Sequence, residues 1–418
     1  MKKKIILLIV GTTLLMTMCS KNEKIDWNKD LNYLAKELPK KHYNFFTVKS
    51  KDDFLSGIKA IKRQSNNLND LQIALKTQQL IATFGDSHTM LNFSHLINVD
   101  QILPIALFGT SDGFHILHTT PENEKILGCQ LLSINNFPIA TVIDSLSTLL
   151  TIDNQAMIKQ FIPQTIASLQ FLEYFGFADT VQVELGLKTE TGQIQTYVLK
   201  PSFWSKSNSV SVKPDSVAFV LKNDKTLFTD FYFPDERIYY VLYNHCWSKE
   251  AELIYGDKDN ADNFPSFKEF EEKVFNDLAT KSVEKIVFDM RYNNGGSSIQ
   301  GTEFVERLAK FLETNPTIKT YVVIGSATFS SAILNAMDFK RLTNAVFVGE
   351  ETGGKPNHFG EVKRFQLPTS KIIVKYSTKY FERTEEGVNT LAPDVKIEMS
   401  FSDFMKGIDP VYDWIKEQ

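Results

Sequence analysis

Ser330 lies in a segment that could supply a nucleophile. Residues 325–332 read Gly-Ser-Ala-Thr-Phe-Ser-Ser-Ala, between an apolar run that predicts a buried strand and an expected helix. A serine at such a junction exposes its Oγ, and the backbone N–H groups after it point outward from the helix N-terminus. The simpler interpretation is that Ser330 only caps the helix. Acyl transfer also needs a base and donors for an oxyanion, so other segments must supply them.

His88 is a candidate for the base. Residues 85–89 read Gly-Asp-Ser-His-Thr and predict a polar loop after a helix. Histidine suits proton transfer near neutral pH because its reference pKa is about 6.5. Taken alone, a histidine in a loop is more often a surface or structural residue. The other six histidines lack such a setting, although His358 lies close to a further glycine-rich segment.

Two glycine-rich segments could complete the site. Residues 289–296 read Asp-Met-Arg-Tyr-Asn-Asn-Gly-Gly, so Gly295 and Gly296 follow an apolar strand. Glycines there let the backbone approach a ligand and present N–H donors. The alternative is an ordinary turn between a strand and a helix, which Asn-Gly also favours. Residues 349–355, Gly-Glu-Glu-Thr-Gly-Gly-Lys, follow the next strand and could bring Lys355 to the same edge.

The elements that must position these residues alternate between strand and helix over residues 236–400. Repeated strand–helix–strand units favour right-handed crossovers and a parallel or mixed sheet. A helix is expected to begin near Ser330. The remaining apolar patterns predict strands at 238–243, 285–290, 320–324, 345–348 and 372–376 and helices at 267–278 and 299–311.

The first 200 residues contain two different patterns. Residues 26–84 have apolar spacing typical of three helices, with Pro39 expected to end the first. Residues 100–200 are rich in short β-type runs, with a helical insertion at 153–178 and further strands at 180–199. Residues 128–135 resemble the strand and turn of PDZ domains, and the alternative is a hairpin with Asn135-Asn136 in the turn.

The amino terminus predicts export. Lys2, Lys3 and Lys4 precede an apolar stretch, residues 5–18, that is too short to span a bilayer comfortably and has the character of a secretory signal. Cys19 follows at once and resembles the lipidated cysteine of bacterial lipoproteins, although Met16-Thr17-Met18 matches that pattern poorly. Plain secretion and a retained anchor helix are the alternatives. We therefore expect a cell-envelope protein of a Gram-negative bacterium, held to a membrane through a lipid on Cys19.

Composition excludes several classes of protein. The 418 residues carry a net charge of −4, with acids and bases mixed throughout, so we expect no nucleic-acid partner. Only Cys129 and Cys246 follow Cys19, which excludes a disulfide scaffold but leaves open whether the two pair. The absence of Cys-x-x-Cys and His-Glu-x-x-His motifs argues against a zinc site. The absence of Gly-x-Ser-x-Gly argues against an α/β-hydrolase.

Taken together, these segments resemble the carboxyl-terminal processing peptidase family, which includes the tricorn core and the modules of interphotoreceptor retinoid-binding protein. The resemblance covers about residues 26–415. Residues 289–296 match its Asp-x-Arg-x-Asn-x-Gly-Gly motif, 328–332 its nucleophile motif, and 349–355 its Gly-Glu-x-Thr-x-Gly-Lys motif. Its closing strands and tail are matched by Leu367-Pro368-x-Ser370, Pro393-Asp394-Val395 and Gly407-x-Asp409-Pro410.

The resemblance implies an α/β fold in which an N-terminal helical bundle and a PDZ-like β-rich domain precede a ClpP/crotonase-like catalytic core. It also implies hydrolysis of peptide bonds in proteins or peptides without a metal or other cofactor. We expect a signal peptide at 1–19, the helical domain at 20–95, the PDZ-like domain at 96–200 and the peptidase core at 201–418. The sequence leaves the oligomeric state open.

The family offers two catalytic designs. Processing peptidases use a Ser–Lys dyad with a glutamine four residues after the lysine, and Lys355 has the spacing from Ser330 that this design uses. Phe359 occupies the glutamine position, however. The tricorn design pairs serine with histidine, and Ser87-His88 matches it directly. A lysine base would also need its pKa lowered by several units, so His88 is favoured over Lys355.

These roles follow from the tricorn design. Ser330 attacks the carbonyl, His88 accepts its proton, and Ser87 orients the imidazole together with Glu385 or Glu386. The amides of Gly295 or Gly296 and of Ser331 would bind the oxyanion, and Lys355 could instead bind a substrate carboxylate or brace the site. Two rival hypotheses are an inactive binding or carrier protein on the same scaffold and an envelope interaction module in which the PDZ-like part binds chain ends.

Overall fold

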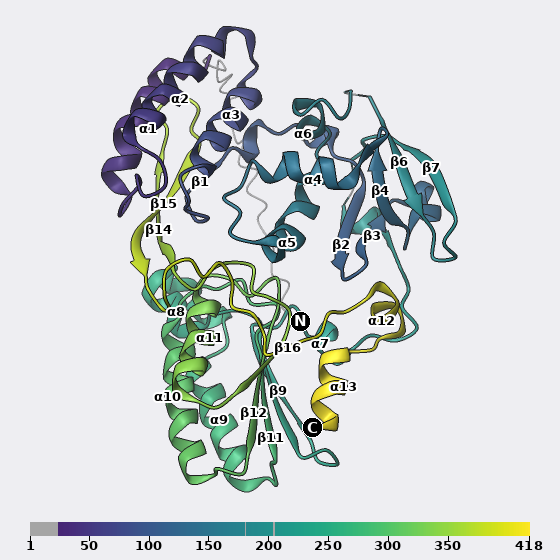
Figure 1. Cartoon of the computed structure of the whole chain (residues 1–418), viewed down its shortest axis with the longest axis vertical. Helices are drawn as coiled ribbons and strands as arrows, with labels where there is room; N and C mark the ends of the chain where they lie inside the picture. Colours follow the sequence, from purple (N-terminus) through teal and green to yellow (C-terminus); the bar gives the residue numbers. More distant parts are fainter. Residues whose placement is uncertain (1–23, 180, 204) are drawn as a thin grey trace, which may run out of the picture.

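A computed structural model describes residues 24–179, 181–203 and 205–418 of the chain. Figure 1 shows three parts: helices and a small sheet at the upper left, a β-rich part at the upper right, and an α/β part below. The expected signal peptide and Cys19 lie outside the described residues. Within the described ranges, no helix is long and apolar enough to cross a membrane.

The lower part contains a six-stranded sheet of order β16-β13-β12-β11-β10-β9, in which only the edge strand β9 is antiparallel to its neighbour. The alternation predicted for residues 236–400 is therefore confirmed as a mixed sheet with helical crossovers. Its elements are β9 Phe228–Phe233, β10 Ile238–Tyr243, α8 Lys249–Tyr255, α9 Phe267–Thr280, β11 Lys285–Asp289, α10 Ile299–Thr314, β12 Lys319–Ile324, α11 Ser331–Leu342, β13 Val346–Gly349, β16 Val395–Lys396, α12 Phe401–Lys406 and α13 Pro410–Glu417.

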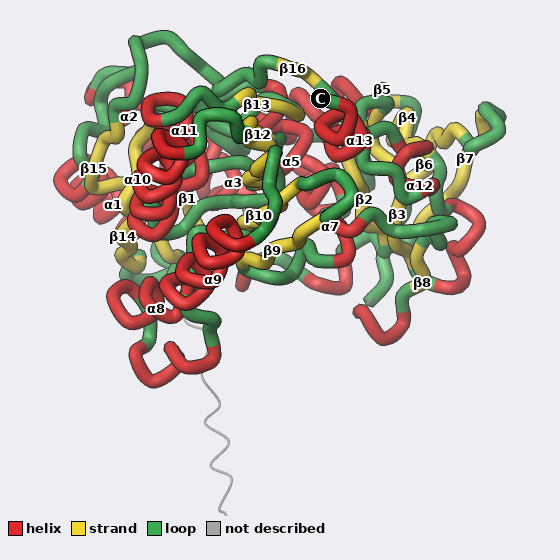
Figure 2. The backbone as a smooth tube through the Cα atoms, turned by 90° about the horizontal axis from the view of Figure 1, so that it is seen from below, coloured by secondary structure: helices red, strands yellow, loops and turns green. Residues whose placement is uncertain are grey.

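Both faces of this sheet are covered. Every residue of β10 is buried, and alternate side chains enter two different cores. Tyr239 and Val241 pack with α9, α10 and α11, whereas Tyr240 and Leu242 pack with α13 and the short helix α7, Phe219–Lys222. Figures 1 and 2 show the long helices on one side of the strands. Burial on both faces explains why these strands are continuous apolar runs rather than alternating ones.

The N-terminal helices pack on strands from much later in the chain. The helices are α1 Trp27–Lys41, α2 Lys51–Gln64 and α3 Asp70–Ala82, and the sheet has the order β1-β15-β14, with β1 Met90–Asn92, β14 His358–Gln366 and β15 Ile373–Phe381. Leu31, Phe54 and Val374 belong to one buried cluster. The helical unit expected at 20–95 therefore shares its core with a hairpin from the C-terminal half, a long-range contact that no local pattern announces.

The prediction that Pro39 ends the first helix is wrong. Pro39 lies inside α1, which continues to Lys41, and His42 is the C-cap. Proline removes one backbone donor but holds a φ that a helix accepts, so a last half-turn can follow it.

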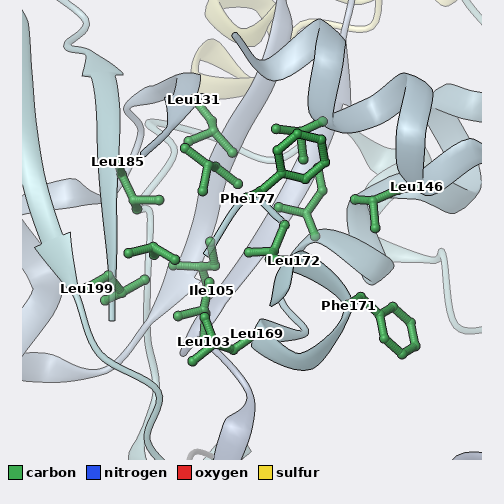
Figure 3. Close-up of a cluster of buried hydrophobic side chains, with 14 of the residues drawn as sticks. Leu103, Ile105, Leu131, Leu146, Leu169, Phe171, Leu172, Phe177, Leu185 and Leu199 are labelled. Carbon is green, nitrogen blue, oxygen red and sulfur yellow. The ribbon is translucent and has the colours of Figure 1, made fainter. Parts of the chain in front are cut away.

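The β-rich part is a seven-stranded sheet that packs on α4, α5 and α6. Its elements are β2 Ile105–Thr110, β3 Gly113–Thr119, β4 Gln130–Ile134, β5 Phe137–Pro138, α4 Ile139–Ser147, α5 Gln155–Ile166, α6 Leu169–Tyr174, β6 Val183–Lys188, β7 Ile194–Leu199 and β8 Val210–Ser211. Asn135 and Asn136 both have positive φ and form the tight turn between β4 and β5. Figure 3 shows Leu131, Leu185 and Phe177 in its core. Because β8 pairs with β3, this sheet extends beyond residue 200.

Candidate active site

Ser330 occupies a strained turn between β12 and α11. Its φ is 54° and its ψ is −124°, a conformation that costs a non-glycine residue of the order of 1–3 kcal/mol. Ser330 stands at the N-cap position of α11, but its side chain makes no capping hydrogen bond. The turn is braced beneath by Thr328, whose buried hydroxyl donates to the carbonyl of Met290 and accepts from the amide of Gly325. Helix capping therefore does not explain the position of the Ser330 hydroxyl, which must have another hydrogen-bond partner.

That partner is His88. Its Nε2 lies 2.9 Å from Ser330 Oγ, although 242 residues separate the two in the chain. His88 sits in the loop between α3 and β1, and β1 is fixed by its pairing with β15. The imidazole stacks on the ring of Phe329, with centroids 4.8 Å apart, and on that of His358, with centroids 5.6 Å apart. The N-terminal helical unit thus carries a histidine to the start of α11.

The surroundings of His88 favour its neutral form. Burial lowers the pKa of His88 to about 4, the charges of His358 and Lys375 act in the same direction, and the Asp86 carboxylate opposes them. A neutral imidazole with Nε2 beside a hydroxyl can accept its proton, which is the role of a general base. At neutral pH this histidine is in the form that the reaction requires.

The expected orienting residues lie differently. Ser87 is buried, but in the part of the chain that the structure describes no hydrogen bond joins its hydroxyl to His88. Glu386 is exposed in the turn before β16 and makes no ion pair with a described residue, and Glu385 is exposed as well. The carboxylate beside the imidazole belongs to Asp86, whose Oδ1 lies 3.8 Å from His88 Nδ1. No interaction joins Glu385 or Glu386 to His88 among the described residues, so the role expected of Glu386 stays a prediction.

The glycine turn lies directly against the serine. A Cβ on Gly295 would come within 2.9 Å of Ser330 Cβ and 3.0 Å of the Ser331 nitrogen, and the φ of Gly295 is +97°, so no other residue fits there. Its N–H already donates to Asn293 Oδ1, however. The amides of Gly296 and Ser331 have no hydrogen-bond partner among the described residues, and the Ser331 hydroxyl holds the Gly296 carbonyl. The available oxyanion donors are therefore Gly296 and Ser331 rather than Gly295.

Lys355 is engaged elsewhere. Its Nζ lies 3.2 Å from Asp153 Oδ1, which precedes α5, and the Asp153 side chain is 2% exposed. Its backbone carbonyl accepts from His358 Nδ1. The ammonium group of Lys355 therefore has a carboxylate partner away from Ser330 Oγ, whose hydrogen-bond partner is His88. This position separates Lys355 from the role that the Ser–Lys design would give it.

We expect replacement of Lys355 by methionine to affect stability more than chemistry. The change strands the Asp153 carboxylate, which should lower the free energy of unfolding by about 1–3 kcal/mol. We expect kcat to fall less than tenfold. Thermal unfolding and peptide hydrolysis would measure the two effects, and the double variant Lys355→Met/Asp153→Asn should recover the stability. A loss of hydrolysis as complete as in Ser330→Ala would instead make Lys355 the base.

A cavity of about 410 Å³ borders this region, between the β-rich part and the carboxyl ends of β11, β12 and β13. Asn294 and Ala327, neighbours of the glycine turn and of the nucleophile turn, line it. Its wall mixes apolar side chains, such as Phe108 and Pro163, with charged ones, and an ion pair between Lys159 and Glu350 crosses from α5 to the core. No group of three or more metal-ligating side chains occurs among the described residues.

Asp86 and Asn293 are site residues that the sequence reasoning did not select. Asp86 had a local signal, since an aspartate two residues before His88 can accept from the histidine amide, and it does so at 2.8 Å. Asn293 was part of the quoted motif without a role. Its side chain binds the Gly295 amide and donates to the Tyr243 carbonyl, which fixes the glycine turn on β10.

Comparison with known proteins relates this geometry to a known fold. No family model matches the chain, and no curated protein matches its sequence. Mature CPAF complexed with lactacystin matches at 14% identity with a TM-score of 0.62, over 94% of this chain and 97% of that one. Mature CPAF alone matches at 14% identity and a TM-score of 0.62, over 94% and 96%. The photosystem II D1 C-terminal processing protease matches at 15% identity and a TM-score of 0.38, over 94% and 99%. The chain thus has the fold of mature CPAF over nearly its whole length, in agreement with the predicted resemblance to the processing peptidase and tricorn-core family.

Proposed function

We propose that this chain is a serine peptidase of the carboxyl-terminal processing peptidase and tricorn-core family, which cleaves peptide bonds through an acyl-enzyme on Ser330. The observation that carries the proposal is the 2.9 Å contact between His88 Nε2 and Ser330 Oγ at the start of α11. Ser330 is strained, makes no hydrogen bond to its own helix and faces a neutral imidazole. This arrangement suits proton transfer from the hydroxyl.

The proposed reaction passes a proton through His88 Nε2 twice, once in acylation and once in deacylation. Ser330 Oγ attacks the peptide carbonyl carbon while His88 Nε2 takes the hydroxyl proton. The carbonyl oxygen becomes an oxyanion, for which the amides of Gly296 and Ser331 are donors. His88 then returns the proton to the amine as the C–N bond breaks. The same nitrogen then takes a proton from a water molecule, whose oxygen attacks the acyl ester, and returns that proton to Ser330 Oγ as the ester C–O bond breaks.

We place a substrate side chain next to the cleaved bond in the cavity beside Asn294 and Ala327. The second candidate function is a carrier that uses the cavity alone. The contact between Ser330 and His88 favours the peptidase, since a carrier gains nothing from a strained serine beside a neutral histidine.

A fluorophosphonate probe tests the proposal. The purified protein is incubated with the probe, digested, and the labelled residue is identified by mass spectrometry. We expect a single labelled serine, Ser330, together with hydrolysis of an unfolded protein such as casein. A protein that stays unlabelled and cleaves nothing, while remaining folded by circular dichroism, would contradict the peptidase and support the carrier.

We propose that the protein is held at a membrane of the cell envelope by a lipid on Cys19. The support is the sequence alone: three lysines, a short apolar stretch and the cysteine. Replacing Cys19 with serine should move the protein from the membrane fraction to the soluble fraction of a Gram-negative host and remove the mass of the lipid. Ser20→Ala is the matched control. An unchanged membrane fraction would exclude the lipid anchor.

A further inference from the structure

The carboxylate of Asp86 is held by donors from several elements. Its Oδ2 accepts from the Nε2 of His42 at 2.9 Å and from the hydroxyl of Thr89, and its Oδ1 accepts from the amide of His88 at 2.8 Å. The buried hydroxyl of Ser377 on β15 acts on the carboxylate in the direction that lowers the pKa of Asp86. The Asp86 side chain is 3% exposed. A buried carboxylate with so many donors is fixed in position and in charge.

The tautomer of His42 follows from its neighbours. The backbone N–H of Asn44 donates to His42 Nδ1 at 3.0 Å, so Nδ1 carries the lone pair. In the neutral ring the proton is therefore on Nε2, which donates it to Asp86. The ring is 1% exposed and meets the rings of Phe45 and Phe359 edge-on, with centroids 5.5 and 5.0 Å away. His42 is locked by packing from α1, from the following loop and from β14.

His88 has an unused nitrogen on the same side. Because Nε2 faces the Ser330 hydroxyl as an acceptor, the neutral ring must carry its proton on Nδ1. That buried Nδ1 has no hydrogen-bond partner among the described residues, and it lies 3.8 Å from Asp86 Oδ1. A hydrogen bond between the two atoms requires the imidazole to move toward the carboxylate, because 3.8 Å is beyond hydrogen-bonding distance. The acceptor that the reacting histidine needs is thus already in place and aimed at it.

We propose that Asp86 is the acid of this site, which orients His88 and stabilises its imidazolium, and that His42 is a positioning residue that holds the Asp86 carboxylate toward it. The inference rests on the proposed peptidase function. When His88 takes the proton of Ser330, the ring becomes a buried cation, and a fixed carboxylate at Nδ1 stabilises it. His42 never meets the substrate; it keeps Oδ2 occupied, so that Oδ1 faces the imidazole.

We call His42, Asp86 and His88 together the relay, and the charges around it agree with this assignment. Burial alone would raise the pKa of Asp86, but the hydrogen bond from His42, the charge of His88 and the hydroxyls of Thr89 and Ser377 lower it to about 2. Asp86 is therefore ionised whenever His88 is active. The other titratable groups that act on His88 are His358 and Lys375, and both disfavour the imidazolium. Asp86 is the group among these that favours it.

Three variants test the proposal: Asp86→Asn, His42→Phe and His42→Gln, with the exposed Asp52→Asn as control. We expect Asp86→Asn to lower kcat by about 10³- to 10⁴-fold, as for loss of a triad acid. His42→Phe should lower kcat roughly 10- to 100-fold with KM nearly unchanged. His42→Gln, whose amide can still donate to Asp86, should recover most of that loss. Equal activity of His42→Phe and wild type, or a glutamine variant no better than phenylalanine, would overturn the role of His42.

A readout independent of hydrolysis separates this inference from the peptidase proposal. The pKa of His88 can be followed by NMR of its Cε1 proton in the whole protein. Because the Asp86 carboxylate favours the imidazolium, Asp86→Asn should shift this pKa downward, and Asp52→Asn should leave it unchanged. An unlabelled Ser330 with this shift present would reject the peptidase but keep the relay. A labelled Ser330 with full activity in Asp86→Asn and no shift would reject the relay alone.

Discussion

Replacing Ser330 with alanine should lower kcat roughly 10⁵- to 10⁶-fold and abolish labelling by a fluorophosphonate. The Ser330 hydroxyl faces His88, whereas the neighbouring Ser331 hydroxyl is bound to the Gly296 carbonyl, and loss of a serine nucleophile typically has this size of effect. Its side chain makes no capping bond, so the free energy of unfolding should change by less than about 1 kcal/mol. Hydrolysis of a fluorogenic peptide and thermal unfolding measure the two quantities.

Ser94→Ala is the matched control, since Ser94 is exposed and lies outside the site. It should keep both labelling and full activity. Retention of even a tenth of the wild-type rate by Ser330→Ala would show that the acyl-enzyme does not form on this residue. The carrier hypothesis would then account better for the cavity.

Replacing His88 with glutamine should lower kcat about 10⁴- to 10⁶-fold at neutral pH while substrate binding persists. Glutamine fills similar space and keeps a polar atom near Ser330 Oγ, but it cannot accept a proton. Labelling of Ser330 should slow by a similar factor, because the hydroxyl is no longer activated. Rates of probe labelling and of peptide hydrolysis, measured side by side, check the result.

The pH dependence of the wild type gives a second measure of the same residue. His88 must be neutral to act, and its pKa is lowered from about 6.5 to about 4 by burial, His358 and Lys375. Activity should therefore persist below pH 6 and fall as the pH drops through about 4. His95→Gln, a change at an exposed histidine, should leave this profile unchanged. A rate that falls already near pH 6.5 would mean that the imidazole is solvated and not sheltered.

Local patterns in the sequence determined the elements and the chemical parts. The apolar run of β10 has the bounds predicted for it, residues 238–243, and the alternation of strands and helices over 236–400 predicted a parallel or mixed sheet, which the structure shows to be mixed. The same local patterns placed Ser330 at a helix start, His88 in a loop and Gly295 in a turn. Period, turn chemistry and motif spacing express the conformational preferences of a few neighbouring residues, so they can be read without coordinates.

Only the tertiary structure decided which of these parts meet. His88 reaches Ser330 because the N-terminal helices bury their apolar face against the β14–β15 hairpin, and the same packing brings His42 to Asp86 and leaves Glu386 exposed. Lys355 has the spacing from Ser330 of a possible base, but its ammonium group forms an ion pair with the buried Asp153. Contacts between residues so far apart depend on the summed burial of whole surfaces, and no single segment carries that information.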